Sequence, residues 1–107
     1  MAELKLFLFG TPRLERGGEA IDLETRKAMA LLAYLAVTGQ GHAREALAGL
    51  LWPDFDPPRA LANLRRTLWA LNKATRGDLV EADGETVRLN PGAGLWVDAR
   101  AFEERLT

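Results

Sequence analysis

The sequence predicts one α+β domain in which a small antiparallel sheet comes first, three helices follow, and a β-hairpin ends the series. Two observations indicate this order. Apolar residues alternate with a period of two before residue 24, take helical spacing between residues 24 and 76, and alternate again after Gly77. With 107 residues, of which 48% are hydrophobic and 27% charged, the chain is also long enough to bury one core.

The composition excludes several classes of site. The chain has no Cys and one His, so it offers no Cys/His zinc site, thiol nucleophile or disulfide framework. Apolar runs such as "AMALLAYLAV" are much shorter than the roughly 20 residues of a membrane span, and the N-terminus lacks a signal-peptide pattern. We therefore expect a soluble, cytoplasmic protein with no membrane partner, cofactor or metal.

Short strands are expected at the N-terminus. The segment "LKLFLFGTPRLERGGEAIDL" alternates apolar and polar residues and is interrupted by Gly10, Pro12 and the Gly17-Gly18 pair. This pattern predicts two or three antiparallel strands joined by tight turns.

The first helix is predicted to begin at Glu24 and to end near Gly39 and Gly41, which suit a left-handed cap. Its apolar positions recur at three and four residues: Met29, Leu32, Leu35 and Ala36.

The second and third helices are separated by "PDFDPP", which stops the second helix. The second is expected from Arg44 to Trp52, with one apolar side formed by Leu47, Leu50 and Leu51. Pro58 opens the third helix, where its missing N–H costs nothing, and this helix is expected to continue to Arg76.

After Gly77, "LVEADGETVRL" indicates a hairpin that turns at Asp83-Gly84. Its apolar positions are Leu79, Val80, Val87 and Leu89. The tail "LWVDARAFEERLT" begins a further apolar-periodic element, with Trp96, Phe102 and Leu106 as candidates for one face.

The third helix concentrates positive charge. Five basic residues and no acidic one lie between positions 59 and 76, which leaves 9 of the 14 Lys and Arg to face all 15 Asp and Glu elsewhere. The rest of the chain therefore has a balance of -6, although the whole chain has a formal charge of -1.

A helical wheel at about 100° per residue separates two sides of this helix. The core side gathers Leu61, Leu64, Leu68, Leu71 and Thr75. The opposite side carries Arg59, Ala62, Arg66, Trp69 and Lys73, with Asn63 at one margin and Arg65 and Arg76 at the other. A solvated helix usually mixes signs, whereas this stretch offers its cations no carboxylate.

Two interpretations of the basic side remain open. It could simply balance an acidic surface elsewhere on the domain. Alternatively, it binds nucleic acid, because phosphates attract a basic face and because Arg and Asn read guanine and adenine edges in the major groove. The order of elements favours the second, since a short helix, a turn, a basic helix and a hairpin form a winged helix-turn-helix.

Four segments carry a family resemblance: "RKAMALLAYLA", "AREALAGLLWPD", "RALANLRRTLWALNKA" and "VRLNPGAGLWVDARAFEERL". They resemble the N-terminal OmpR-type winged-helix domain of SARP-type bacterial transcriptional activators, and they cover nearly the whole chain in the family's order. The resemblance implies a winged helix-turn-helix DNA-binding domain over residues 1–94. Residues 95–107 would begin the connection to a C-terminal, helical-repeat bacterial transcriptional activation domain (BTAD). It also implies binding to direct-repeat DNA sites, often as tandem copies.

The sequence departs from this family at two places. Ala43 stands where the family usually has Ser or Thr to open the second helix, so the cap is weak or is supplied by another group. The wing tip carries Asp83 and Glu85, which repel phosphate, and Arg88 is its one cation. Arg88 is either a DNA contact or a solvent-facing strand residue.

These observations predict sequence-specific binding to double-stranded DNA by a bacterial transcription regulator that is not an enzyme. Base-edge or adjoining backbone contacts are expected from Arg59, Asn63 and Arg66, and phosphate contacts from Arg65, Lys73 and Arg76. Trp69 would cover a sugar or a thymine methyl, or contact a protein. The alternative is a protein-interaction module that docks RNA polymerase, a second copy or another acidic partner on the same helix.

Other candidates are assigned more ordinary roles. Arg26 and Lys27 could reach phosphate or form a solvated first turn of the first helix. The pair in "DFD" at 54–56 could bind a metal but suits a turn. We expect His42 in a loop or short strand, Trp52 in the core, and Trp96 packed against the domain.

Overall fold

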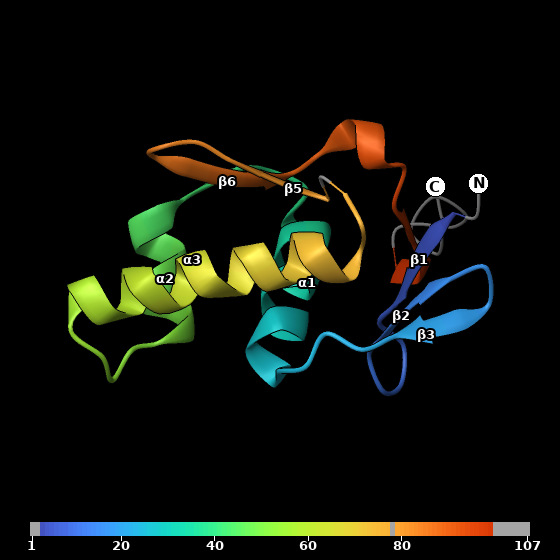
Figure 1. The fold of residues 1–107 in the computed structure, drawn as a ribbon, viewed down its shortest axis with the longest axis horizontal. Coiled ribbons are helices and arrows are strands. Elements are labelled where there is room, and N and C mark those ends of the chain that lie inside the picture. Colours follow the sequence, from blue (N-terminus) through green and yellow to red (C-terminus); the bar gives the residue numbers. More distant parts are fainter. Residues whose placement is uncertain (1–2, 78, 100–107) are drawn as a thin grey trace.

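The computed structural model describes residues 3–77 and 79–99. In this part of the chain, an N-terminal sheet stands at one end of the molecule, and three helices with a small second sheet form the other end (Figure 1). The arrangement is the predicted winged helix-turn-helix. Phe102 and Leu106 of the tail lie outside the described residues.

The N-terminal sheet has the strand order β3-β2-β1-β7. Its bounds are β1 Leu4–Phe7, β2 Arg13–Arg16, β3 Glu19–Ile21 and β7 Trp96–Val97. The first three strands pair antiparallel, as predicted, while β7 lies parallel to β1 and was not foreseen. A two-residue strand has too little periodicity to be recognised from its sequence.

Side-chain contacts hold β7 in this sheet. The Trp96 ring lies 5.5 Å from the Phe7 ring, between centroids, and the Lys5 amine lies 5.6 Å from the Trp96 ring. The Asp98 carboxylate accepts the backbone N–H groups of Leu8 at 2.9 Å and Phe9 at 3.2 Å. The predicted packing of Trp96 against the domain is confirmed.

Helix α1, Arg26–Thr38, begins two residues later than predicted. The Thr25 hydroxyl accepts the Ala28 N–H and caps the helix, while Glu24 adopts a left-handed conformation with φ 69° and cannot belong to it. Gly39 ends α1 with φ 66°, so the predicted left-handed cap is confirmed.

Helix α2, Arg44–Leu51, follows the short strand β4, His42–Ala43. Ala43 provides no side-chain cap, and the Arg44 N–H donates instead to the Glu85 carbonyl of the hairpin at 2.8 Å. Leu47 and Leu51 are buried, but the prediction for Leu50 was wrong, because its side chain is 54% exposed. Leu47 and Leu51 are about one helical turn apart and therefore share a side of α2, whereas Leu50 is rotated away from Leu51 by about 100°.

Helix α3 runs from Pro57 to Ala74, so it begins one residue before the predicted Pro58 and ends two residues before the predicted Arg76. The Gly77 N–H donates to the Asn72 carbonyl and the Arg76 N–H to the Lys73 carbonyl, the two bonds of a Schellman motif. Arg76 occupies its left-handed position with φ 59°. The C-terminal end of α3 is joined to the N-terminal sheet, because the Arg16 side chain donates to the Thr75 carbonyl at 2.6 Å.

The hairpin consists of β5, Val80–Ala82, and β6, Thr86–Leu89, as predicted. With β4 it forms a second sheet in the order β4-β6-β5, and a 3₁₀ turn, η1, Pro91–Ala93, leads on to β7. The Asn72 side-chain amide of α3 donates to the Val80 carbonyl at 3.0 Å and accepts the Val80 N–H at 2.9 Å. These two hydrogen bonds fix the hairpin beside α3.

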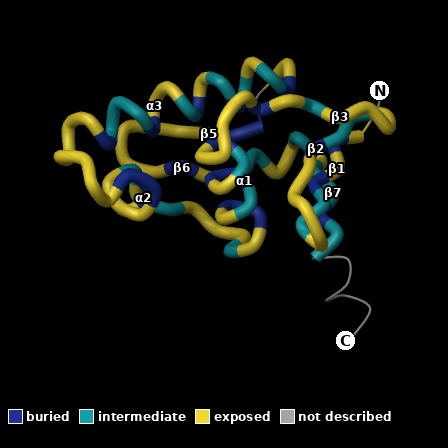
Figure 2. Tube along the Cα trace, turned by 90° about the horizontal axis from the view of Figure 1, so that it is seen from below, coloured by how far each residue is buried: buried dark blue, intermediate teal, exposed yellow. Residues whose placement is uncertain are grey.

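The core is formed by the helices and the inner sides of both sheets, and buried and exposed positions alternate along α3 (Figure 2). Fully buried leucine and valine side chains come from the N-terminal sheet, all three helices, and the hairpin with the residue before it: Leu6, Leu14, Leu31, Leu32, Leu35, Leu47, Leu64, Leu71, Leu79 and Val87. Trp52 is buried, and His42 lies in the short strand, as expected. No helix in the described ranges is long and apolar enough to cross a lipid bilayer.

The left-handed conformation of Arg76 leads to a stability prediction. A side chain with a Cβ is disfavoured there, so Arg76→Gly should raise the free energy of unfolding, measured in urea, by about 1 kcal/mol. In contrast, Arg65→Gly within α3 should lower it by about 1 kcal/mol. A loss of stability in Arg76→Gly would mean that the arginine side chain makes a contact that outweighs the backbone gain.

Candidate nucleic-acid interface

The outward side of α3 is basic and exposed. We call it the basic face, and its residues are Arg59, Asn63, Arg65, Arg66, Trp69 and Lys73. All are exposed except Asn63, which is half-buried, as expected for a residue at the margin. On the opposite side Leu64, Leu68 and Leu71 are buried, so the predicted rotation of the helix is confirmed. Leu61, expected on the core side, is half-buried and packs against the core.

Trp69 lies near the middle of the basic face and is 64% exposed. The Lys73 amine lies 4.8 Å from the centroid of the Trp69 ring, one helical turn away. This cation–π contact keeps the positive charge beside the indole while both groups stay accessible to a ligand.

The N-terminal end of the basic face has an acidic neighbour that the stretch 59–76 does not contain. Asp56, the residue before α3, lies 3.4 Å from the Arg59 guanidinium, so the expectation that these cations have no carboxylate was wrong at this position. Both side chains are more than half exposed. Pairs of this kind contribute about 0–1 kcal/mol, so a phosphate could compete for Arg59.

Arg65 lies on the side of α3 that faces the hairpin. With Leu61 it borders a groove of about 530 Å³ whose other walls are the start of α2 and the hairpin turn: Ala43, Arg44, Glu45, Gly84 and Glu85. The hairpin therefore flanks the basic face, as a wing does. The groove has two carboxylates beside one basic-face arginine, so its own field is mixed.

The wing carries little free positive charge. Arg88 is exposed on β6, and its guanidinium lies 2.8 Å from the Glu81 carboxylate on β5. Arg88 is therefore a solvent-facing strand residue whose ion-pair partner is Glu81. At the turn, Arg44 donates to the Asp83 carbonyl at 2.5 Å, which ties the wing to the first residue of α2.

Asp83 organises the turn of the wing. Its carboxylate accepts the backbone N–H groups of Thr86 and Glu85, both at 2.7 Å, and the Thr86 hydroxyl at 3.1 Å. The bond from the Thr86 N–H is the largest of the contributions that lower the pKa of Asp83, followed by the bond from Glu85. The tip of the wing therefore keeps its negative charge.

Arg76, Arg26 and Lys27 do not belong to the basic face. Arg76 follows the end of α3 and borders a groove shared with Leu4 and Arg16 of the N-terminal sheet. Arg26 lines a different groove, between α1 and strands β2 and β3. The Lys27 amine donates to the Leu51 carbonyl at the end of α2 and lies 5.9 Å from the Trp52 ring.

Sequence reasoning missed two residues that position the interface, Asn72 and Arg44. Asn72 is a polar residue on the inner margin of a helix otherwise lined with Leu and Ala, and such a position indicates a buried hydrogen-bond role. Arg44 gave no signal, because its partners are backbone carbonyls of a hairpin about 40 residues away. In residues 3–77 and 79–99, no three His, Asp or Glu side chains are grouped to bind a metal ion, and "DFD" forms a turn.

A solved structure has the same fold. EmbR of Mycobacterium tuberculosis, in complex with a low-affinity phosphopeptide, aligns with a TM-score of 0.72 and 23% sequence identity. The alignment covers 89% of this chain and 27% of EmbR, so the chain spans about a quarter of the length of that protein. No protein-family model and no curated protein sequence matches the chain. The likeness establishes the winged-helix fold.

The bonds at Asp83 lead to a pH prediction. A carboxyl whose pKa is lowered by folding adds stability above its unfolded pKa of about 3.9, and this is lost as the pH falls through the lower, folded pKa. NMR should therefore show the Glu85 and Thr86 amide signals unchanged at neutral pH and shifting only in strongly acidic solution. Thr86→Val, which removes one donor, should move the midpoint to higher pH. An ordinary aspartate midpoint in the unsubstituted protein would contradict these bonds.

Proposed function

We propose that this chain is a sequence-specific double-stranded DNA-binding domain of a bacterial transcription regulator, and that α3 enters the major groove. The observation that carries the proposal is the basic face itself. Four arginine and lysine side chains and one exposed tryptophan project from one side of a helix whose other side is buried. Phosphates attract such a surface, and a helix of this size fits the major groove.

The position of each side chain suggests its role. Arg66 lies near the centre of the basic face, where it would reach base edges, with Arg59 and Asn63 on either side of it. Arg65 at the wing margin and Lys73 near the end of α3 would contact phosphates. Arg76 lies beyond the helix, so we assign it at most a phosphate outside the groove.

The wing has a different role in this proposal. Asp83 and Glu85 at its tip repel phosphates, and Arg88 would have to exchange Glu81 for DNA. Insertion of this wing into a minor groove is therefore unfavourable. We propose that α3 supplies the sequence readout and that the wing limits how far the domain can rotate toward the backbone.

The resemblance to SARP-type activators extends the proposal to a larger protein. Its copies would lie in tandem on direct-repeat promoter sites, and they would recruit RNA polymerase. The domain would itself perform no catalysis.

A second function is favoured by Trp69. A side chain of this size that is 64% exposed suits a contact with another molecule, and its basic neighbours would attract an acidic protein. In this alternative, the basic face docks RNA polymerase or another acidic partner, and DNA is not its ligand.

The central position of Arg66 gives a test of sequence readout. Arg66→Ala should cost about 1–3 kcal/mol on a specific site and much less on random duplex, because base contacts distinguish sequences and phosphate contacts do not. Fluorescence anisotropy with promoter DNA and with shuffled DNA at one salt concentration measures both. Arg13→Ala, on β2 and paired with Glu15, is the control and should change neither. Equal losses on both DNAs would make Arg66 a backbone contact.

Trp69 separates the DNA function from the protein-docking alternative. If DNA covers the ring, Trp69→Ala should weaken DNA binding and remove the fluorescence change on adding duplex, with little effect on melting temperature because the ring is exposed. Trp52→Phe, at a buried site, should preserve the fluorescence change. Intact DNA affinity in Trp69→Ala, together with loss of polymerase binding, would favour the alternative.

A further inference from the structure

The outer side of α1 is apolar and uncovered. No charged residue occurs from Ala28 to Thr38, and the inner side buries Leu31, Leu32 and Leu35. On the outer side Val37 is 69% exposed and Tyr34 is 37% exposed. A surface helix normally carries charged residues on its solvent side, and a helix that is apolar all round is normally covered on both sides.

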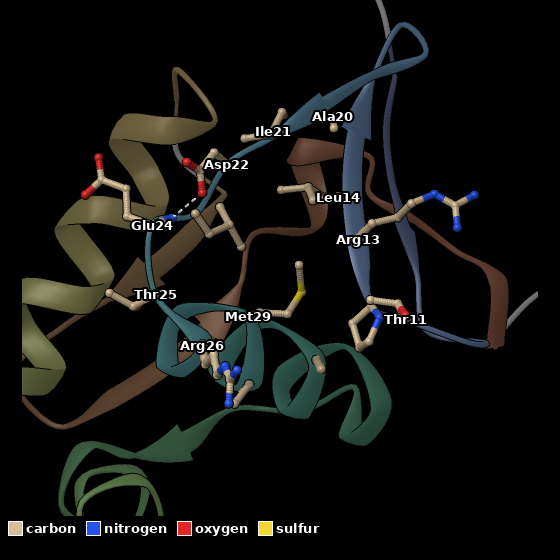
Figure 3. Close-up of a pocket in the computed structure, with 14 residues that line it drawn as sticks. Thr11, Arg13, Leu14, Ala20, Ile21, Asp22, Glu24, Thr25, Arg26 and Met29 are labelled. Carbon is tan, nitrogen blue, oxygen red and sulfur yellow. Dashed lines mark hydrogen bonds between the residues drawn. The ribbon is translucent and has the colours of Figure 1, made fainter.

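The apolar surface continues from α1 onto the N-terminal sheet. Strands β2 and β3 and the outer side of α1 border a groove of about 620 Å³. Figure 3 shows Leu14 and Ile21 from the sheet and Met29 from α1 around this groove. A partner that packs on α1 would therefore also contact the apolar side of strands β2 and β3.

The spacing of the outer residues indicates what kind of body fits. Arg26, Ala30, Ala33 and Val37 follow one another at steps of four, three and four residues, the spacing of a seam between two packed helices. The series reads the same in both directions. If a second α1 lies antiparallel across a twofold axis, Ala30 therefore faces Ala33 of the other copy, and Arg26 faces Val37 of the other copy.

Charge complementarity favours the same arrangement. The first turn of α1 holds Arg26 and Lys27 and no acid, which is unfavourable beside the positive end of the helix dipole, and the last turn holds no base to stabilise the negative end. Lys27 is already bonded to the carbonyl end of α2. Arg26 is exposed, and its side chain has no hydrogen bond or ion pair to another of the described residues. An antiparallel partner helix places its C-terminal carbonyls beside Arg26. Each copy thereby supplies the cation that the C-terminal end of the other copy's α1 lacks.

We propose that the outer side of α1 is the interface of a twofold dimer of this chain, in which the two α1 helices pack antiparallel and each Arg26 lies at the carbonyl end of the other copy's α1. The contact has an apolar centre at Ala30 and Ala33 and one cation at each edge. This is the arrangement of a self-complementary interface.

This interface does not depend on the proposed DNA binding, and its twofold axis is a different relation from the tandem placement of two copies on a direct repeat. Helices α1 and α3 bury their inner sides in the same core, so their outer sides point away from each other. The dimer leaves the basic face of α3 free in both copies. Failure of the dimer would leave the DNA-binding proposal unchanged, because the two are measured separately.

The test is sedimentation equilibrium of the 107-residue chain without DNA, over a range of concentrations. The chain should dimerise, and Ala33→Arg, at the axis, should abolish the dimer. Arg26→Glu and Val37→Lys should each weaken it by about tenfold or more, because each places an unfavourable charge at the edge of the contact. The double variant Arg26→Glu/Val37→Lys should restore dimerisation, since Glu at 26 then faces Lys at 37 of the other copy.

Leu50→Glu is the matched control, because Leu50 is an exposed apolar residue on α2 and lies outside the interface. It should dimerise like the unsubstituted chain. The proposal is overturned by a chain that stays monomeric, by a double variant that is no better than its single variants, or by equal loss in Leu50→Glu. Circular dichroism checks the folding of every variant. If Ala33→Arg is unfolded, the comparison of the double variant Arg26→Glu/Val37→Lys with its two single variants tests the proposal.

Discussion

Burial of the leucine stripe of α3 is the constraint on which the candidate interface depends. Leu64 and Leu71 are fully buried and Leu68 nearly so, and together they fix the rotation of the helix about its axis. Burying three leucines stabilises the domain by several kcal/mol, at about 1.5–3 kcal/mol for each side chain. A rotation that turned Arg66 or Lys73 inward would lose this energy and also bury a charge. The hydrophobic core therefore decides which side chains of α3 meet a ligand.

Polar contacts then position the other elements around that helix. The Asn72 side-chain amide holds β5 beside α3. The side chain and the backbone N–H of Arg44 both bind carbonyls in the turn of the wing. Arg16 joins the end of α3 to the N-terminal sheet. Each of these bonds involves a backbone group at a turn, a strand edge or a helix end, where regular secondary structure leaves it without a partner. The same bonds that satisfy the backbone thus set the distance between the wing and the basic face.

The two outward helix faces differ in chemistry, and the difference suggests separate tasks. The basic face of α3 is charged, with its indole beside a lysine, which suits a wet and salt-sensitive contact with phosphate. The outer side of α1 is apolar with one cation at its edge, which suits contact with protein. Because both helices share one core, mutations in that core would affect both surfaces, whereas exposed residues of either helix can be changed separately.

The sequence by itself determined the order of the three helices between two β regions, the leucine side of α3 and, except for Arg76, the residues on its basic side, since these follow from periodicities of two and 3.6 residues within short windows. It could not place Leu50 or the ends of α1 and α3, because single hydrogen bonds at Thr25 and Gly77 decide those boundaries. Only the tertiary structure brought the wing turn to Arg44 and Arg16 to the end of α3. It also recruited β7 to pair with β1 across some 90 residues of chain. The physical reason is that periodicity reports which way a side chain points from its own backbone, while its partner depends on how separate elements pack.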